Sequence, residues 1–382
     1  MVELPRHANS AEIEEFADRF LAPELRAAAK ALVSSGSDAP VGEEGDLNSN
    51  RLVELQTVFG WGTEDVDVQI NAMAADGTEA TFCMGDDAPL AVLSDFPHSL
   101  YDYFKQRFAQ VTNPPIDPLR EGAVMSLSMY LGPKGDTLSL EAQNDVRVKI
   151  DSPILNQAEA DALASMDGVE VATVSTLYPM TTALALGGLK ETLEKICDAA
   201  VEAVRNGATV VNLSDKPDPA SGEQGLRGSA YIPPLLAVGA VHHRLIDLGL
   251  RPQASIMVTT GNAWNTHHFA CLVGYGASAI VPYAAYDAVI NWHGQTRIQN
   301  AMNSGKLKKV SVLQAIDNFR KASDKGLLKV SEKDLFVIRH LLFVIRRFAT
   351  IPHHYSLSLT NHSNARISIH AQIKSCNICT LL

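Results

Sequence analysis

Apolar and polar positions follow a regular rhythm between residues 151 and 284. Apolar residues recur on one helical face in four stretches, at residues 157–166, 189–204, 235–248 and 266–273. Gly207 and Gly249 follow two of these helices, where a helix-ending glycine is expected. Short, mostly apolar segments predict buried strands at residues 169–174, 208–213, 255–260 and 277–282. This alternation is typical of an α/β protein with a parallel sheet covered on both faces.

Two architectures satisfy this pattern. An open, doubly wound sheet and a βα-barrel both consist of parallel βα units, and they differ in strand count, tilt and closure. The pattern alone does not separate them, so both remain open at this point.

The first 150 residues are more mixed. Residues 11–32 have helical spacing, and residues 34–50 are rich in Ser, Gly, Asp and Glu, which predicts a flexible linker. Thr63 precedes acidic residues and is expected to cap a helix. An aromatic helix is predicted over residues 100–108. Three prolines between residues 114 and 118 then require a rigid extended loop.

Composition narrows the function classes. The chain has 382 residues, of which 46% are apolar, and its formal net charge is −11. That balance argues against binding to nucleic acid or to an anionic membrane, which requires a basic face. Five cysteines are too few for a disulfide framework and fit a reducing compartment. The most apolar stretch, residues 335–348, is too short and too charged to cross a bilayer.

The last 52 residues differ from the rest in composition. Residues 331–382 contain none of the 25 glycines and carry more basic than acidic residues. We expect this tail to be non-native or disordered, with translated non-coding sequence as the simplest explanation. The tail holds Cys376 and Cys379, a single CxxC pair that is weak evidence for a zinc site.

Other residues of types that occur in metal and catalytic sites also have purely structural interpretations. The pairs His242-His243 and His267-His268 could each supply one metal ligand, but we favour one packed and one solvent-facing histidine in each pair. The glycines of residues 274–276 lead into a strand, so they suit helix termination rather than a phosphate cradle. Cys271 is expected in the core.

Two groups of polar residues stand where α/β proteins build sites. Ser214-Asp215 and Thr259–Asn262 come at the carboxyl ends of predicted strands, although capping and turns use the same residue types. The proline-rich loop carries Thr112, Asn113 and Asp117, which suit a domain interface or a channel lining as well as they suit a structural crossover. From the residues alone, the chain is an α/β scaffold or interaction domain without identifiable catalytic machinery.

Several long segments resemble the central region of glutamate synthase, and they occur in that family's order. They are Met84-Gly-Asp-Asp-Ala-Pro-Leu, Tyr101-Asp-Tyr-Phe-Lys-Gln-Arg-Phe followed by the proline-rich loop, Tyr231-Ile-Pro-Pro-Leu-Leu, and Thr266-His-His-Phe-Ala-Cys-Leu. The segment Ala263-Trp-Asn-Thr resembles the ferredoxin-dependent branch. The resemblance covers about residues 51–330, which divides the chain into 1–50, 51–330 and 331–382.

The resemblance implies a fold and a role. The family's central region resembles a degenerate or incomplete TIM-like βα-barrel, here with an irregular N-terminal lobe. It joins a glutaminase domain to an FMN-binding synthase domain and helps to wall the ammonia tunnel, near which Thr112, Asn113 and Asp117 would lie by analogy. FMN, the iron–sulfur cluster and the partner ferredoxin belong to the complete enzyme. We therefore expect no catalytic residue, cofactor or metal in this chain, no activity of the chain alone, and a soluble protein of plastids or cytoplasm.

The same features leave a second hypothesis open. A free-standing, non-catalytic interaction module could dock on partner domains supplied as separate chains. A metal-dependent α/β enzyme that uses the histidine pairs is a weaker third possibility.

Overall fold

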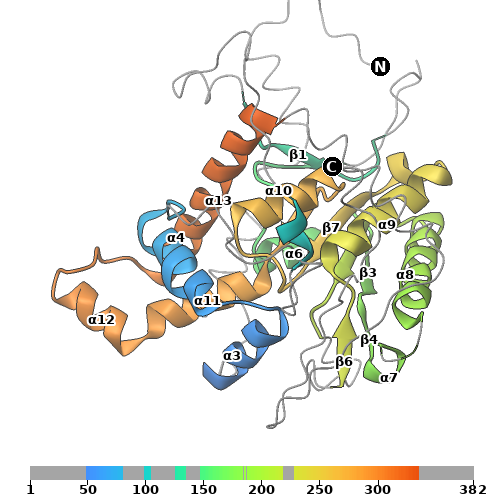
Figure 1. Cartoon of the computed structure of the whole chain (residues 1–382). Helices are drawn as coiled ribbons and strands as arrows, with labels where there is room; N and C mark the ends of the chain where they lie inside the picture. Colours follow the sequence, from blue (N-terminus) through green and yellow to red (C-terminus); the bar gives the residue numbers. More distant parts are fainter. Residues whose placement is uncertain are drawn as a thin grey trace, which may run out of the picture.

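The computed structural model describes a central part of the chain (Figure 1). The described residues are 49–80, 99–104, 125–134, 147–183, 185, 187–217 and 228–334. The predicted helix at residues 11–32, the proline-rich loop and the tail beyond residue 334 lie outside them.

Four parallel strands form the central sheet. They are β3 (Val171–Ser175), β5 (Val210–Ser214), β7 (Ser255–Thr259) and β8 (Ala279–Val281), and they lie side by side in chain order. Every residue of β5 and β7 is buried, as expected for central strands of a parallel sheet that is covered on both faces. Beyond β8, Ile154 makes an isolated parallel bridge with Ile280. The predicted parallel α/β class is therefore confirmed.

Three crossover helices cover one face of the sheet. They are α8 (Gly188–Arg205), α9 (Pro234–Asp247) and α10 (Thr266–Gly274). Their apolar residues share one core with alternate sheet residues such as Val211, Ile256 and Ile280. All three helices pack on the same face of the sheet.

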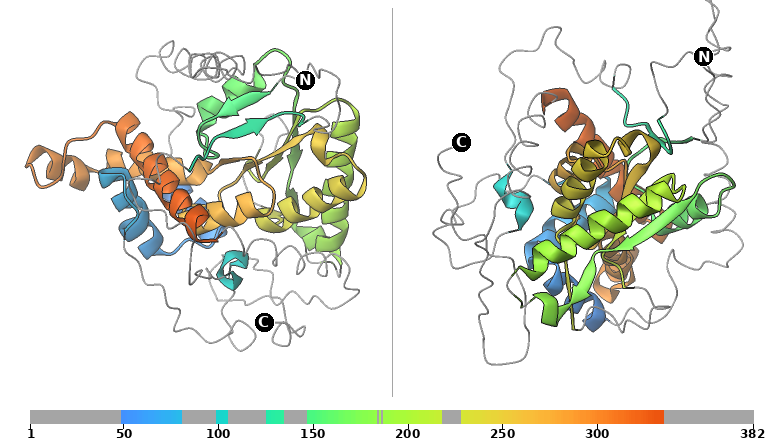
Figure 2. Two further views of the ribbon diagram at one scale, coloured as in Figure 1. Left: turned by 90° about the horizontal axis from the view of Figure 1, so that it is seen from above. Right: turned by 90° about the vertical axis from the view of Figure 1, so that its right-hand side faces the viewer.

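The opposite face has its own core. Here Val210, Met257 and Val281 pack against α6 (Gln157–Ala164) and a short antiparallel pair, β1 (Met129–Leu131) and β2 (Val148–Ile150). Figure 2 shows α6 and the β1–β2 pair across the sheet from α9 and α10. Both faces are thus covered, as predicted. Among the described residues the sheet remains open, with β3 and β8 at its edges, and closure into a barrel is not found.

A helical lobe packs beside the sheet. It consists of α3 (Ser49–Val58), the π-helix η1 (Asp65–Ile70) and α4 (Asn71–Asp76), which meet α11 (Tyr283–Gly294) and the long α13 (Val312–Asp334). Asn318 on α13 donates from Nδ2 to the carbonyl oxygens of Ala74 and Ala75, at 2.9 and 3.2 Å. Arg320 on the same helix forms a 2.6 Å ion pair with Glu159 of α6. Helix α13 therefore connects the lobe to the far side of the sheet.

Local predictions hold where spacing was clear and fail at some boundaries. Gly207 and Gly249 have φ values of 100° and 69°, the left-handed conformation expected after a helix. Of the aromatic helix predicted over residues 100–108, the described part is one 3₁₀ turn, η3 (Leu100–Tyr103), after which Phe104 is extended. Residues 105–108 lie outside the described residues. The predicted linker is also too long, since α3 begins at Ser49. Thr63 lies inside a helical turn; Asp65 accepts the Gly62 amide at 2.7 Å instead.

Candidate functional site

The buried polar centre of the molecule lies at the carboxyl ends of β5 and β7. The Asp215 carboxylate accepts hydrogen bonds from the Thr260 hydroxyl at 2.5 Å and from the Gly261 amide at 2.9 Å. The Asn262 amide in turn donates to the Thr260 hydroxyl at 2.9 Å. These are the two groups that the sequence places at strand ends, and the parallel sheet brings them together. We call this group of residues, 215 and 260–262, the Asp215 centre.

The Asp215 centre also binds the N-terminal lobe to the sheet. The Asn262 side chain donates from Nδ2 to the carbonyl oxygen of Phe59 at 2.9 Å. The Trp61 indole donates from Nε1 to the carbonyl oxygen of Gly261 at 3.0 Å. Both hydrogen bonds join residues about 200 positions apart in the sequence. The Asp215 centre therefore links distant parts of the chain.

Burial sets the protonation of the carboxyl group. Asp215 is only 2% exposed, and desolvation raises its pKa to about 7, despite the opposing effect of its hydrogen bonds. The negative charge in turn helps to raise the pKa of the phenols of Tyr101, Tyr231 and Tyr283, for all of which burial is the largest cause. Tyr283 lies beside the carboxyl group, but its hydroxyl lies outside hydrogen-bond geometry. The centre is suited to a neutral acid rather than to a permanent charge.

A row of stacked rings adjoins the centre. Tyr101 stacks on His268 with ring centroids 4.2 Å apart, and Trp264 meets the same imidazole edge-on at 4.4 Å. Trp264 also packs against Trp61, with ring centroids 4.7 Å apart. Burial keeps the pKa of His268 well below its usual value, so this imidazole is neutral and acts as a packing group.

The two histidine pairs are thus parts of the packing. His267 is half-buried and its Nε2 lies 3.0 Å from the carbonyl oxygen of Tyr101. His242 accepts from Arg251 Nε at 3.1 Å, and burial lowers its pKa to about 4. Of the four histidines only His268 is fully buried and none is fully exposed, which corrects the expected split into packed and solvent-facing members. Within the described ranges, no three His, Cys, Asp or Glu side chains are placed to hold a metal ion.

The glycine-rich turn after α10 ends the helix, as predicted. Helix α10 stops at Gly274, and Gly276 has a φ of 114°. A Cβ at Gly276 would lie 2.4 Å from Nδ1 of His242, so the turn allows close packing and offers no anion cradle. Cys271 is half-buried, and burial raises its thiol pKa to about 12, which makes it a poor nucleophile.

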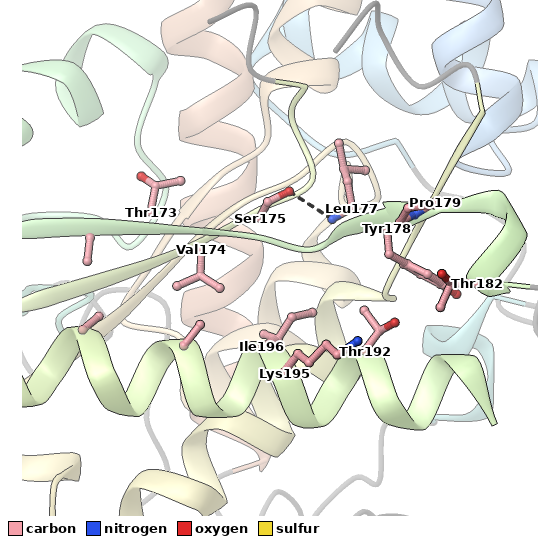
Figure 3. A pocket seen from close by; sticks show the side chains of 13 residues that line it. Thr173, Val174, Ser175, Leu177, Tyr178, Pro179, Thr182, Thr192, Lys195 and Ile196 are labelled. Carbon is pink, nitrogen blue, oxygen red and sulfur yellow. Dashed lines mark hydrogen bonds between the residues drawn. The ribbon is translucent and has the colours of Figure 1, made fainter. Parts of the chain in front are cut away.

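One cavity opens beside the edge strand. Figure 3 shows this cavity of about 520 Å³ between β3 and α8, with Thr173, Tyr178 and Thr192 among the residues that line it. Lys195 also lines it, but its ammonium group pairs with Glu191 at 2.7 Å. The lining contains no acid–base pair and therefore no evident catalytic arrangement.

The residues predicted to lie at a tunnel or interface are not placed by the structure. Thr112, Asn113 and Asp117 fall outside the described residues, as do Cys376 and Cys379. The aromatic side chains around Asp215 were missed by the sequence analysis. A usable signal was the segment Phe59-Gly-Trp-Gly, in which two large rings alternate with glycines.

The buried histidines predict acid sensitivity. A histidine whose folded pKa is depressed stabilises the fold fully above its normal pKa, and this stability is lost as the pH falls. For His268 we expect a loss of up to about 1.4 kcal/mol per pH unit below about 6.5. His268→Phe keeps a ring in the stack and removes the titration. Urea unfolding at pH 7.5 and pH 5 should show a smaller acid loss for this variant; an equal loss would contradict the assignment.

The fold and the site together define a parallel α/β domain. Its buried polar centre links the ends of two strands to the N-terminal lobe by hydrogen bonds. The family model of the glutamate synthase central domain matches residues 54–334. The chain belongs to this family.

The relatives are much longer proteins. The chain is 46% identical over 286 residues to ferredoxin-dependent glutamate synthase 2 of Synechocystis, covering 75% of this chain and 18% of that protein. It is 48% identical over 287 residues to chloroplastic ferredoxin-dependent glutamate synthase 2 of Arabidopsis thaliana, with 75% and 17% covered. The chloroplastic enzyme of spinach gives 46% identity over 287 residues. The chain therefore spans less than one fifth of these relatives.

Proposed function

We propose that this chain is the central, non-catalytic domain of a ferredoxin-dependent glutamate synthase. It joins the glutaminase and FMN-synthase domains of the parent enzyme and helps to wall the ammonia passage between them. The observation that carries this proposal is the match over residues 54–334 to a segment that is less than one fifth of each relative. In plants and algae the location would be the plastid, in line with the chloroplastic relatives, and elsewhere the cytoplasm.

The residues of the structure support a spacer role. Asp215 is enclosed by hydrogen bonds within the fold, and the described cysteines, Cys197 and Cys271, have raised thiol pKa values of about 11 and 12. These groups do not fit FMN or an iron–sulfur cluster, and we assign those cofactors to other domains of the parent. The consecutive order of the four parallel strands supports an incomplete βα-barrel as the finer description of the fold.

A chimera tests the role directly. Residues 54–334 of this chain would replace the matching segment of the Synechocystis enzyme. We expect the chimera to form glutamate from glutamine, 2-oxoglutarate and reduced ferredoxin, with little free ammonia. The isolated chain should form none. Turnover by the isolated chain that is sensitive to a substitution within residues 51–330 would contradict the proposal.

The tunnel assignment has its own test in that chimera. Asn113→Leu removes a polar group from the proline-rich loop and should raise the free ammonia released per glutamine consumed by severalfold. Arg205→Ala, on the exposed side of α8, is the matched control and should leave the ratio unchanged. An unchanged ratio for Asn113→Leu, and for equivalent changes at Thr112 and Asp117, would remove these residues from the passage.

The second candidate remains a free-standing module that docks on separate partner domains. Binding of the isolated chain to separately expressed glutaminase and synthase domains, without covalent linkage, would favour this alternative.

A further inference from the structure

A basic projection extends from the end of α11. It consists of residues 295–311, which include α12 (Thr296–Asn303) and the loop that follows, and we call it the basic arm. Figure 1 shows α12 in orange, set apart from the sheet and its crossover helices. The arm contains four basic residues and no acidic residue, in a chain whose net charge is −11. All four cations are exposed: Arg297, Lys306, Lys308 and Lys309.

The arm is held in place by its own contacts. Ile298, Met302 and Val310 are buried and anchor its inner side. Nε2 of His293 lies 2.9 Å from the carbonyl oxygen of Val310, and the Gln299 side chain donates to the carbonyl oxygen of His293 at 2.6 Å. The cations therefore stand on an ordered support, which reduces the entropy lost when a partner binds.

The contacts of the described residues do not show that these four cations stabilise the fold. Among the described residues none of the four forms an ion pair, whereas Lys190 and Lys195 of α8 each pair with a glutamate one turn away. Arg297 lies in the first turn of α12, where the helix dipole disfavours a positive charge. The helix dipole therefore does not explain the position of Arg297.

We propose that the basic arm is a docking surface for a protein partner with a carboxylate-rich face. Charge complementarity steers such encounters and fixes their orientation. One feature favours a protein over nucleic acid: the arm has no aromatic residue on which a base could stack. The choice of probe rests on the proposed function, because the relatives are named as ferredoxin-dependent and ferredoxin is an acidic protein.

The test measures binding of oxidised plant-type ferredoxin to the complete chain at low ionic strength by titration calorimetry. The arm variant is Lys308→Glu/Lys309→Glu. The matched control is Arg205→Glu/Lys329→Glu, which makes the same change in net charge at exposed positions on α8 and α13. We expect at least a tenfold loss of affinity for the arm variant and less than a threefold loss for the control. Wild-type affinity should fall steeply as salt is added.

Three results would overturn the proposal. They are no binding of ferredoxin to the wild type, equal losses in the two variants, and tighter arm-dependent binding of single-stranded DNA or of vesicles with anionic lipid. Lys308→Gln/Lys309→Gln should lose less affinity than the charge reversal, and unchanged circular dichroism verifies the fold of each variant. The chimera experiment tests the proposed function separately. If the chimera forms glutamate without releasing free ammonia but ferredoxin does not bind the isolated chain, only the proposal for the basic arm is contradicted.

Discussion

Replacing Gly261 by alanine should lower the free energy of unfolding by about 1–3 kcal/mol, the range for overpacking of a full core. A Cβ at this position would lie 2.2 Å from Cε2 of Phe59. The Phe59 ring is 2% exposed and lies against Tyr231, with ring centroids 4.9 Å apart, so it has little room to move. The backbone is equally constrained, because Gly261 donates to Asp215 and accepts from Trp61.

A matched glycine and a rescue variant make this prediction specific. Gly294 ends α11 and has no heavy atom within 4 Å of a built Cβ, so Gly294→Ala should change stability by less than about 1 kcal/mol. Phe59→Leu removes the ring atoms that collide with the new methyl group. Urea unfolding of Gly261→Ala/Phe59→Leu should therefore show a smaller loss than the sum of the single variants. Equal effects of the two alanine substitutions would show that the close contact does not matter.

The repeating βα units were predictable because their signals are local. Helix α8 shows one apolar face, and its end is marked by Gly207, whose conformation few other residues adopt readily. Strands β5 and β7 are buried on both faces, and three of the five residues in each strand are apolar. Both signals depend on neighbours within about 20 residues.

Elements without such a local signal were missed. Strands β1, β2, β4 (Leu177–Pro179) and β6 (Ser229–Tyr231) have three residues each, which is too few to show a period. Sheet order and closure depend on contacts between distant segments and leave no periodic trace. The aromatic stretch at residue 100 looked helical, but the 3₁₀ turn ends at Tyr103, since Phe104 has the extended values φ −102° and ψ 128°.

The Asp215 centre likewise has a part that could be predicted from the sequence and a part that could not. Ser214-Asp215 and Thr259–Asn262 could be placed together because the carboxyl ends of parallel strands share one edge. Phe59 and Trp61 could not, because their bonds to the centre span about 200 residues. The shift in the Asp215 pKa could not be predicted from the strand pattern either, because its main cause is the burial of the carboxyl group in the folded chain.

That shift predicts the largest pH effect on stability. Burial raises the pKa of Asp215 from the ordinary 3.8 to about 7, so the folded state binds the proton more tightly than the unfolded state does. The stabilisation by the neutral acid is fully present below about pH 4 and is lost as the pH rises through 7. At about 1.4 kcal/mol per pH unit, the loss amounts to about 4 kcal/mol.

Asp215→Asn isolates this contribution. The amide approximates the neutral acid, since its oxygen can still accept from the Gly261 amide. We expect the variant to match or fall below the wild type near pH 4.5 and to exceed it by up to about 4 kcal/mol at pH 8. The buried histidines are common to both proteins, so their acid response cancels in the difference. Asp167→Asn makes the same chemical change at an exposed position and should leave the wild-type pH dependence intact.

The decisive observation is whether Asp215→Asn gains or loses stability relative to the wild type as the pH rises, because two explanations of this buried carboxyl group make opposite predictions for it. A carboxylate held for its charge would stabilise the fold above pH 4, and Asp215→Asn would then be weakest at high pH. A carboxyl group held as a neutral hydrogen-bonding group has the reverse dependence, which the burial of Asp215 predicts, because desolvation outweighs the opposing effect of its hydrogen bonds on the pKa. Urea unfolding curves of the two proteins that stay parallel from pH 4.5 to pH 8 would contradict the burial of this group.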